Sequence, residues 1–371
     1  PESGMALHAT RPFRAPSSAS RKAPSRSAAR LAVALGTAAL AAAACDAPPA
    51  FTPPSGGAGS SAAAAPVPAP DYTLSSENTH ARFSAAIPPV LRVPSGAVIE
   101  VTTEEASDGQ FEPGSGLEAM VNLDFDPIHP LTGPVYVEGA EPGDVLAVTL
   151  HELEILGWGW NGVSPGFGFL ADDFTEPYLR TYEIEPGATE VAFNDRIRIP
   201  LAPFPGVMGV APATEEMLST IPPRANGGNM DNRYHTAGTT VYFPVFVEGA
   251  LFSIGDTHAA QGDGEVSGTA LEAPMRIVYQ VEVLKDHRPI QEPVYETDAY
   301  YATTGFGTTI DEAARKATRY MIDYLVAEHG LTPVDAYALA SMAGDLKISE
   351  AVDVPHMLVS MHMSKSVLGM R

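Results

Sequence analysis

Residues 227–272 read GGNMDNRYHTAGTTVYFPVFVEGALFSIGDTHAAQGDGEVSGTALE. Two apolar runs in this segment, VYFPVFV and ALFSI, are rich in β-branched and aromatic residues and lie between glycines. Runs of this length and composition predict short buried β-strands. Acidic, amide and histidine residues gather at the ends of these strands. Such groups, held beside glycines by buried strands, are what a metal-dependent hydrolytic site requires.

The same alternation of apolar runs and turns extends over the sequence on both sides. VLRVPSGAVIEVTT (90–103) and PVYVEGAEPGDVLAVTLHELEIL (134–156) each predict two strands joined by a turn with proline and glycine. PMRIVYQVEVLKD (274–286) predicts a further strand. Regular strand spacing with such turns is typical of antiparallel β architecture. We therefore expect a mostly β fold with some α structure, in which an antiparallel sandwich or barrel-like core is followed by C-terminal helices.

Two helices are predicted near the C-terminus. Thr309 and Glu312 have the spacing of a capping box, and apolar residues then recur at helical intervals until Gly330. Thr332 and Pro333 have the features of a second helix start, and that helix is predicted to run to about residue 342.

The N-terminal part has the composition of an export signal and a linker. Basic residues precede the apolar segment LAVALGTAALAAAA (31–44), which is too short to cross a bilayer but suits a signal peptide. We expect residues 1–45 to be a lipoprotein-type signal that ends at Cys45, the lipidation site; the alternative is an ordinary signal peptide in which Cys45 is incidental. Residues 46–70, rich in Pro, Gly, Ala and Ser, predict a flexible tether. The protein would then be exported and lipid-anchored on the periplasmic or cell-surface side, with a folded domain over 71–371.

The sequence is strongly acidic. Its formal net charge is −23, and because residues 1–44 contain six basic residues and one acidic residue, the remainder carries −28. Such a surface repels nucleic acid and anionic lipid head groups. We therefore expect no nucleic-acid partner and no membrane contact except through a lipid anchor. The acidic surface is compatible with small neutral molecules and with cations as ligands of the protein.

Two pairs of ionisable residues in the opening segment have alternating spacing. Asp256 and His258 follow the strand ALFSI, and if the chain stays extended both side chains lie on one face, as ligands of one metal would. Asp263 and Glu265 have the same spacing in a turn with two glycines. Crowded carboxylates repel each other unless a cation or raised pKa values relieve them. The alternative, an acidic surface loop with turn glycines, fits the spacing equally well.

The residue types present limit which nucleophiles a hydrolytic site in this chain could use. Cys45 is the only cysteine and lies in the predicted signal, so a thiolate mechanism is excluded for the folded domain. We also expect no activated serine, and the pattern Ser-x-x-Lys does not occur. Water activated by a metal, by a carboxylate or by both remains.

Long segments of the sequence resemble the acetamidase/formamidase family. The resemblance is carried by GGNMDN (227–232), GTTVYFPV (238–245) and GALFSIGDTHAAQGDGEVSGTALE (249–272). HPLTGPVYVEGAEPGDVLAV (129–148) and PFPGVMGVAPA (203–213) extend it towards the N-terminus. The resemblance implies that residues 71–371 form a catalytic domain that hydrolyses C–N bonds of short linear amides to a carboxylate and ammonia.

The resemblance also implies a set of site residues. Asp231, Asp256 and His258 would hold a divalent metal ion, Zn or Ca, that activates water. Glu265 or Asp263 would serve as general base and then acid, and Asn229 would donate to the substrate carbonyl. Four further residues are candidates for the site: His129, His80, Gln261 and Glu272.

Two classes of function are compatible with this sequence. The first is the amidase, whose partners would be a small neutral amide and a second copy of the chain in a homodimer. The second is a non-catalytic, cation-binding β-module on the cell surface with the same fold. Ammonia release with and without a chelator distinguishes them.

Overall fold

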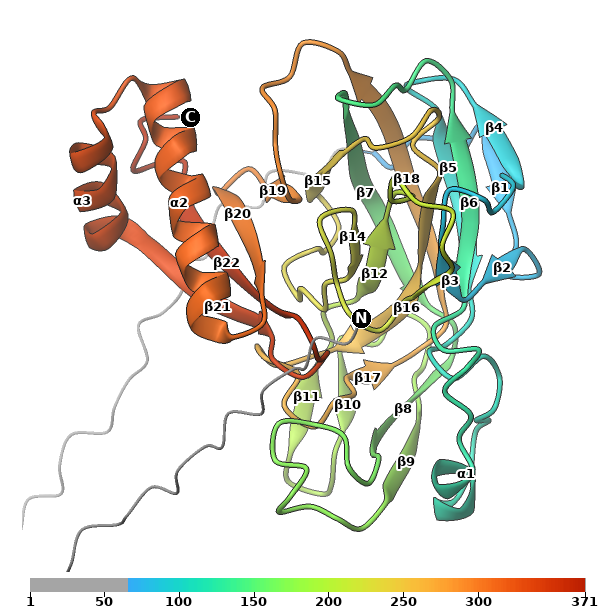
Figure 1. Ribbon diagram of the computed structural model, residues 1–371. Helices are drawn as coiled ribbons and strands as arrows, with labels where there is room; N and C mark the ends of the chain where they lie inside the picture. Colours follow the sequence, from blue (N-terminus) through green and yellow to red (C-terminus); the bar gives the residue numbers. More distant parts are fainter. Residues whose placement is uncertain (1–65, 371) are drawn as a thin grey trace, which may run out of the picture. The chain divides into compact units, whose positions relative to one another are not determined.

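The computed structural model describes residues 66–370. The predicted signal peptide (1–45) with Cys45, and all but the last five residues of the predicted tether (46–70), lie outside the described residues. From Tyr72 onwards the described chain forms two large β-sheets, two small strand pairs and three helices (Figure 1). The predicted mostly β fold with C-terminal helices is confirmed. Within the described range, no helix is long and apolar enough to span a membrane.

The first sheet has nine strands, and most neighbours run antiparallel. Only β1 and β5 pair in parallel. In spatial order the strands are β1 (Tyr72–Leu74), β5 (Val98–Thr103), β18 (Met275–Leu284), β7 (Val145–Ile155), β15 (Thr240–Pro244), β19 (Val294–Glu296), β20 (Tyr300–Gly307), β22 (Met357–Ser364) and β21 (Gly344–Glu350).

The second sheet also has nine strands and carries most of the ionisable residues singled out above. Its main path is β14 (Gly227–Asn229), β12 (Phe204–Gly209), β16 (Phe252–Ala260), β17 (Leu271–Glu272), β8 (Trp158–Val163) and β9 (Tyr178–Glu183). On its other side β16 pairs with β6 (Leu131–Val137), which also pairs with β2 (Thr79–His80) and β4 (Leu91–Val93). Two short pairs complete the strands: β10 (Glu190–Ala192) with β11 (Arg198–Pro200), and β3 (Arg82–Phe83) with β13 (Leu218–Ser219).

One hydrophobic core joins the two sheets. It combines side chains of the first sheet, such as Ile99, Val148 and Tyr279, with side chains of the second, such as Met208 and Phe252. The predicted strand–turn–strand segments explain how the sheets come together. In 90–103 and again in 131–155, the first strand (β4 or β6) lies in the second sheet, and the next strand (β5 or β7) lies in the first sheet. Each turn therefore carries the chain from one sheet to the other.

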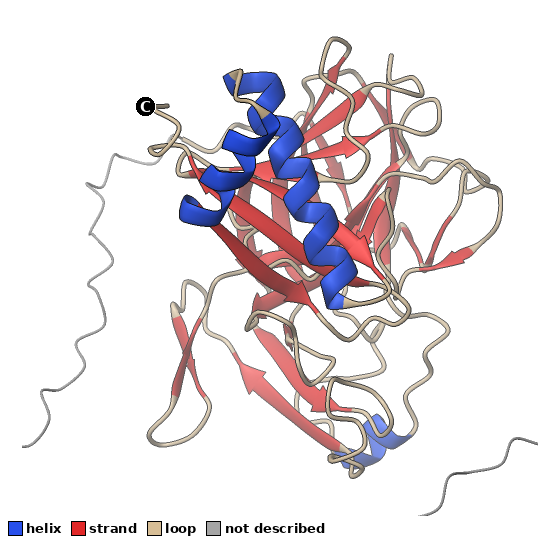
Figure 2. Cartoon of the chain, turned by 60° about the vertical axis from the view of Figure 1, so that its left-hand side comes forward, coloured by secondary structure: helices blue, strands red, loops and turns tan. Residues whose placement is uncertain are grey.

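The C-terminal helices pack on the first sheet, over β20 and β22 (Figure 2). Helix α2 (Ile310–His329) begins where predicted, because the Thr309 hydroxyl accepts the Glu312 N–H, and it ends at Gly330 in the left-handed conformation. Helix α3 (Pro333–Ala343) is capped by Thr332, as predicted. The short helix α1 (Leu117–Val121) has no clear signal in the sequence.

Candidate active site

Five ionisable side chains from the second sheet meet in the interior. Asp231 follows β14, Asp256 and His258 lie on β16, Glu265 lies in the turn after β16, and Glu272 lies on β17. All five are at most 7% exposed. They converge because β17 pairs with β16, which sets Glu272 opposite His258. These five residues are called the buried centre below.

His258 lies in the middle of the buried centre. Its Nε2 atom is 3.0 Å from Glu272 Oε2, 3.4 Å from Asp256 Oδ1 and 3.8 Å from Asp231 Oδ1. On the far side of Asp256, His129 Nε2 lies 3.7 Å from Asp256 Oδ2. The structure therefore brings together the three predicted metal ligands, and it adds Glu272 and His129 from the list of further candidates.

The backbone of the buried centre is strained where its carboxylates are placed. Asp231, Asp256 and Glu265 have φ angles of 40°, 48° and 45°, a left-handed conformation that non-glycine residues rarely adopt. A glycine on β12 makes room for the centre: a Cβ atom on Gly206 would lie 2.6 Å from Asp231 Oδ1 and 2.6 Å from His258 Cε1. Nothing in the sequence pattern singles out Gly206.

Gln261 fixes the orientation and tautomer of His258. Its side-chain Nε2 donates to the backbone carbonyl of Asp231 at 2.6 Å, so its Oε1 must face His258 Nδ1, which lies 2.8 Å away. His258 Nδ1 therefore carries the proton and donates it to Gln261. A neutral His258 would then point the lone pair of Nε2 at three carboxylates, an arrangement that is favourable only if a proton or a cation lies between them.

The charges of the buried centre are strongly coupled. Burial alone would lower the pKa of His258, but Glu272 and Asp256 raise it well above its ordinary value. Burial favours a neutral Asp256, yet the imidazoles of His129 and His258 lower the pKa of Asp256 to about 2. Burial and the charge of Asp231 raise the pKa of Glu265 well above the ordinary range. The same surroundings thus shift the pKa values of Asp256 and Glu265 in opposite directions.

The donor set of the buried centre fits a metal ion. Among the described residues, both carboxylate oxygens of Asp231, Asp256 Oδ1 and Glu272 Oε2 are buried without a hydrogen-bond partner. Buried polar atoms of this kind are rare unless an ion or water satisfies them. Two sets of ligand atoms, each within 4.8 Å of one another, share His258: one with Asp231 and Glu265, the other with Asp256 and Glu272. Glu265, predicted as the general base, therefore also lies close enough to Asp231 and His258 to be a ligand of the same ion.

Two further acids reach the site from the C-terminal part of the chain. Asp353, in the connection between β21 and β22, accepts a 2.5 Å hydrogen bond from Asn229 Nδ2, and Glu350 ends β21. Burial, with the charges of Glu350 and Asp231, raises the pKa of Asp353 well above its ordinary value. Burial also raises the pKa of Glu350 to about 8. The sequence analysis missed both residues; two acids inside the apolar run ISEAVDV were the available signal.

A small pocket of about 50 Å³ adjoins the buried centre. Its floor is polar and includes Asp231, Asp256, Glu265 and Glu272, with Asn229, Asp353 and His129. Its walls are apolar and are formed by Met120, Leu123, Phe125, Ile128, Trp160, Phe167 and Ile221. Trp160 lies on the strand β8, and Phe167 lies in the turn that follows it. The Trp160 indole donates to the buried carboxylate of Glu105 at 2.5 Å, which fixes this wall.

Ser164 also lines the pocket. The expectation that the chain has no activated serine therefore needs a structural argument. The segment GVSPG (162–166) has the Gly-x-Ser-x-Gly spacing of a nucleophile elbow, so an activated serine could not be excluded by sequence pattern alone. The structure supplies the argument instead. β8 is followed by a turn and not by a helix, and within the described part of the chain the Ser164 hydroxyl has no hydrogen bond to a base.

Asp263 and His80 lie outside the pocket. Asp263 and Glu265 were expected on one face, and this is wrong, because positive φ angles at Gly264 and Glu265 turn the chain between them. Asp263 is exposed and accepts a hydrogen bond from the Tyr234 hydroxyl. His80 bonds the Ser253 hydroxyl and the Arg82 carbonyl, and burial lowers its pKa to about 4. Its contacts are those of a structural residue.

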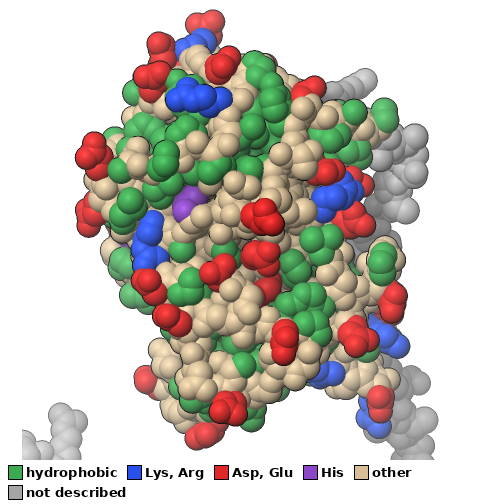
Figure 3. All heavy atoms as spheres, turned by 90° about the vertical axis from the view of Figure 1, so that its right-hand side faces the viewer, with side chains coloured by type: hydrophobic (Ala, Val, Ile, Leu, Met, Phe, Trp, Pro, Cys, Tyr) green, Lys and Arg blue, Asp and Glu red, His purple; other side chains and the backbone are tan. Residues whose placement is uncertain are grey.

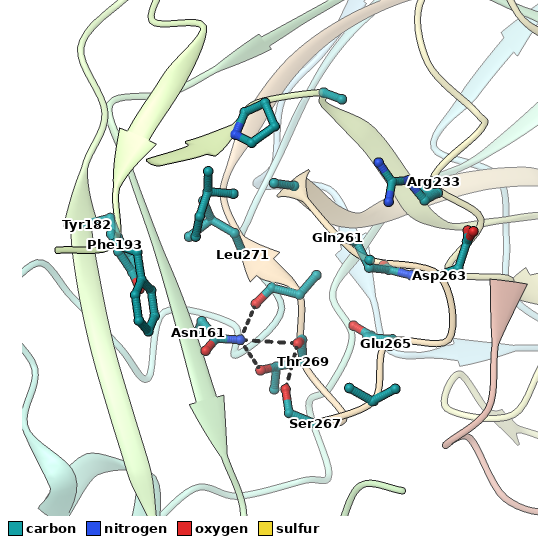
Figure 4. A pocket seen from close by; sticks show the side chains of 17 residues that line it. Asn161, Tyr182, Phe193, Arg233, Gln261, Asp263, Glu265, Ser267, Thr269 and Leu271 are labelled. Carbon is teal, nitrogen blue, oxygen red and sulfur yellow. Dashed lines mark hydrogen bonds between the residues drawn. The ribbon is translucent and has the colours of Figure 1, made fainter. Parts of the chain in front are cut away.

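A wider cleft of about 360 Å³ adjoins the pocket and shares Glu265 and Thr269 with it. Figure 4 shows Tyr182 and Phe193 on one side of this cleft and Arg233 with Asp263 on the other. Asn161 holds the cleft's base through hydrogen bonds from its amide to Thr269 and to the Ala270 carbonyl. Glu265 and Thr269 therefore lie between the enclosed pocket and this open cleft.

The two joined sheets, with a buried acidic centre beside a small pocket, place this protein among β-sandwich proteins that have a site of carboxylates and imidazoles. The chain matches the Acetamidase/Formamidase family over residues 70–219 and 213–369, and it belongs to that family. The family resemblance in the sequence is thereby confirmed.

Individual relatives agree with this assignment. The solved acetamidase of Bacillus halodurans is 32% identical, with a TM-score of 0.75; the match covers 80% of this chain and 98% of that one. The formamidase of Methylophilus methylotrophus is 27% identical over 75% of this chain and 86% of its own length. The acetamidase of Mycolicibacterium smegmatis is 29% identical over 51% of this chain, and the match spans only 61% of that relative.

Proposed function

We propose that this chain hydrolyses short linear amides to a carboxylate and ammonia. Relatives named acetamidase and formamidase support amide hydrolysis. The observation that carries the substrate size is the pocket beside the buried centre, at about 50 Å³. A water-sized group needs about 10–15 Å³, so the pocket holds roughly four such groups. Formamide and acetamide have that size, so the pocket favours them over longer amides.

The acidic surface supports a neutral substrate. On the face drawn in Figure 3, acidic side chains outnumber basic ones, in keeping with the net charge of −23 for the whole chain. Neutral amides approach such a surface without repulsion, whereas carboxylate products are repelled from it. The same charge supports the absence of a nucleic-acid partner.

We further propose that Asp231, Asp256, His258 and Glu272 hold a divalent cation. The His258 imidazole favours Zn over Ca, because Ca takes oxygen ligands almost exclusively. When bound, such an ion lowers the pKa of water and polarises a carbonyl group. Gln261 keeps the Nε2 lone pair of His258 directed at the site, the role that an outer hydrogen-bond partner has for a metal-ligating histidine.

Glu265 is the proposed proton carrier. It is buried, it lines the pocket, and its raised pKa lets it accept a proton from water and return it to the leaving ammonia. Asp263 is not proposed for this step, because its carboxylate is exposed outside the pocket. Asn229 has a second amide N–H besides the one bound to Asp353, and this N–H is proposed to donate to the substrate carbonyl.

Ammonia release from formamide, acetamide and longer amides tests this proposal. We expect turnover of the two shortest amides, loss of turnover with a chelator and its return with the added ion. Glu265→Gln should keep the fold and lower kcat by about 10²-fold, the usual effect of losing a general acid–base. A protein that binds the ion and releases no ammonia from any amide would instead fit the cation-binding module.

Export and lipid anchoring at Cys45 remain proposals that rest on the sequence alone. Mass spectrometry of the N-terminus of the protein from its native membrane tests them. A diacylglyceryl-modified Cys45 is the expected result. An unmodified N-terminus beyond residue 46 would contradict the anchor.

A further inference from the structure

The outermost strand of the first sheet has a free edge. β21 pairs with β22 on one side, and within the described residues Gly344–Ile348 have no strand on the other side (Figure 1). Only at its end does a parallel bridge join Glu350 to Gly264. A free edge exposes a row of backbone N–H and C=O groups that can pair with another strand.

Exposed apolar side chains lie on β21 and on the helix α3 that precedes it. Leu346 and Ile348 of β21 are 52% and 42% exposed. On the neighbouring helix α3, Val334, Tyr337 and Met342 are 72%, 61% and 79% exposed. α3 contains one charged residue, Asp335, in eleven, so it lacks the polar outer face of a surface helix. A cluster of this kind beside an unpaired edge is typical of a protein–protein interface.

We propose that a second copy of this chain pairs with the first through β21. A two-fold axis normal to the sheet pairs two copies of one edge strand in an antiparallel manner. It also leaves the helices of both copies on the same side of one continuous sheet. The interface uses the same surface on each copy, so it closes as a dimer and does not extend into a fibre.

Charge selects the register of this pairing. Because paired residues must point to the same side of the sheet, the axis passes through a residue and not between two. Centring on Asp345 would place Asp345 opposite itself, and centring on Lys347 would place Lys347 opposite itself, and like charges directly opposite are destabilising. Centring on Leu346 places Asp345 of each copy opposite Lys347 of the other. This register is self-complementary in charge.

The same register is also favourable for the apolar side chains. It places Leu346 opposite Leu346 of the second copy and Gly344 opposite Ile348 of the second copy. Leu346 borders a groove of about 450 Å³ between α2 and α3, which is also lined by Ile322 and Tyr337. The second leucine would therefore cover apolar surface that one copy leaves in water.

Cysteine cross-linking tests the register. The full chain with Cys45→Ser has no other cysteine, so each added thiol reports on one position. Under mild oxidation Leu346→Cys should give a disulfide-linked dimer, because residues directly opposite have Cβ atoms close enough for a disulfide. Asp345→Cys and Lys347→Cys are the matched controls and should cross-link much less. Cross-linking at 345 or 347 in preference to 346 would overturn the register.

A charge swap tests the interface in solution by sedimentation equilibrium. The unsubstituted chain should be a dimer at micromolar concentration. Asp345→Lys and Lys347→Asp should each raise the dissociation constant by roughly 10-fold, since each sets two like-charge pairs opposite one another. The double variant should restore the original value. A monomeric unsubstituted chain, or a double variant no tighter than either single one, would overturn the proposal; amide turnover has no part in this test.

Discussion

His258 shows at the scale of one residue how a buried group becomes a metal ligand. It lies 1% exposed among three carboxylates, and without Gln261 its ring could rotate or change tautomer. Replacing Gln261 with leucine keeps the approximate volume and removes the hydrogen bond to Nδ1. We expect Gln261→Leu to weaken metal binding or to lower kcat by ~10–100-fold, the range found for outer-shell partners of metal ligands. Metal titration and ammonia assay measure the two effects.

Asp263→Asn is the matched control for this change. It lies two residues away, but its side chain is exposed and outside the pocket. It should leave metal affinity and turnover close to those of the unsubstituted chain. If Asp263→Asn abolished turnover while Gln261→Leu did not, Asp263 would belong to the site and Gln261 would not be needed to position His258.

Gly206 is a second position where one atom decides the site. A methyl group there would lie 2.8 Å from the Asp256 carbonyl as well as against Asp231 and His258. Gly206→Ala should displace these groups, lower the free energy of unfolding by about 1–3 kcal/mol and reduce turnover at least ~10-fold. Gly262→Ala is the control, since a Cβ atom there meets nothing within 4 Å. Equal turnover in the two variants would contradict the packing argument.

At the scale of elements, the C-terminal helices depend on local signals that are readable in the sequence. The Thr309 hydroxyl accepts the Glu312 N–H at 3.1 Å, and the Glu312 carboxylate accepts the Thr308 N–H at 2.9 Å. The chain thus has a reciprocal cap shifted by one residue from the standard capping box.

Removing this cap should destabilise α2. Thr309→Ala should lower the free energy of unfolding by about 1 kcal/mol, while Thr309→Ser, which keeps the hydroxyl, should change it little. Urea denaturation measures both. Because no residue of α2 lines the pocket, kcat should not change. A fall in kcat with the helix cap removed would show that α2 supports the site.

At the scale of the whole molecule, stability should depend on pH through a buried histidine. His235 is fully buried against the Tyr295 ring, and among the described residues neither of its ring nitrogens has a hydrogen-bond partner. Burial, with a smaller effect of nearby His362, lowers the pKa of His235 to about 3. Between pH 6.5 and 3 the unfolded chain therefore binds a proton that the folded chain does not, and stability falls as the pH falls through this window.

The variant His235→Phe isolates this contribution. At pH 5 the buried histidine should cost the unsubstituted chain about 2 kcal/mol relative to pH 8. Urea unfolding of both proteins at the two pH values measures it, and the loss should be smaller in His235→Phe by that amount. Identical losses in the two proteins would mean that His235 is protonated in the folded state.

Much of the molecule follows from short segments of its sequence. The strand-forming runs, the turns between the two sheets and the caps of α2 and α3 each depend on a few neighbouring residues, so local pattern predicts them. Asp231, Asp256 and His258 were also predictable as a group. Asp231 follows β14 and the other two lie on β16, and the alternating spacing of Asp256 and His258 predicted one site, although the positive φ at Asp256 interrupts the extended backbone that this prediction assumed.

Only the tertiary structure decided which other groups join them. Asn229 meets Asp353, which is 124 residues away, because β21 and β22 bring the C-terminal acids to the end of β14. Gly206 is required by a close approach between strands, and Asp263 is separated from Glu265 by two positive φ angles. Sequence spacing records neither long-range proximity nor the sign of φ at a non-glycine residue. Long-range contacts and positive φ angles therefore decided which side chains make up the site.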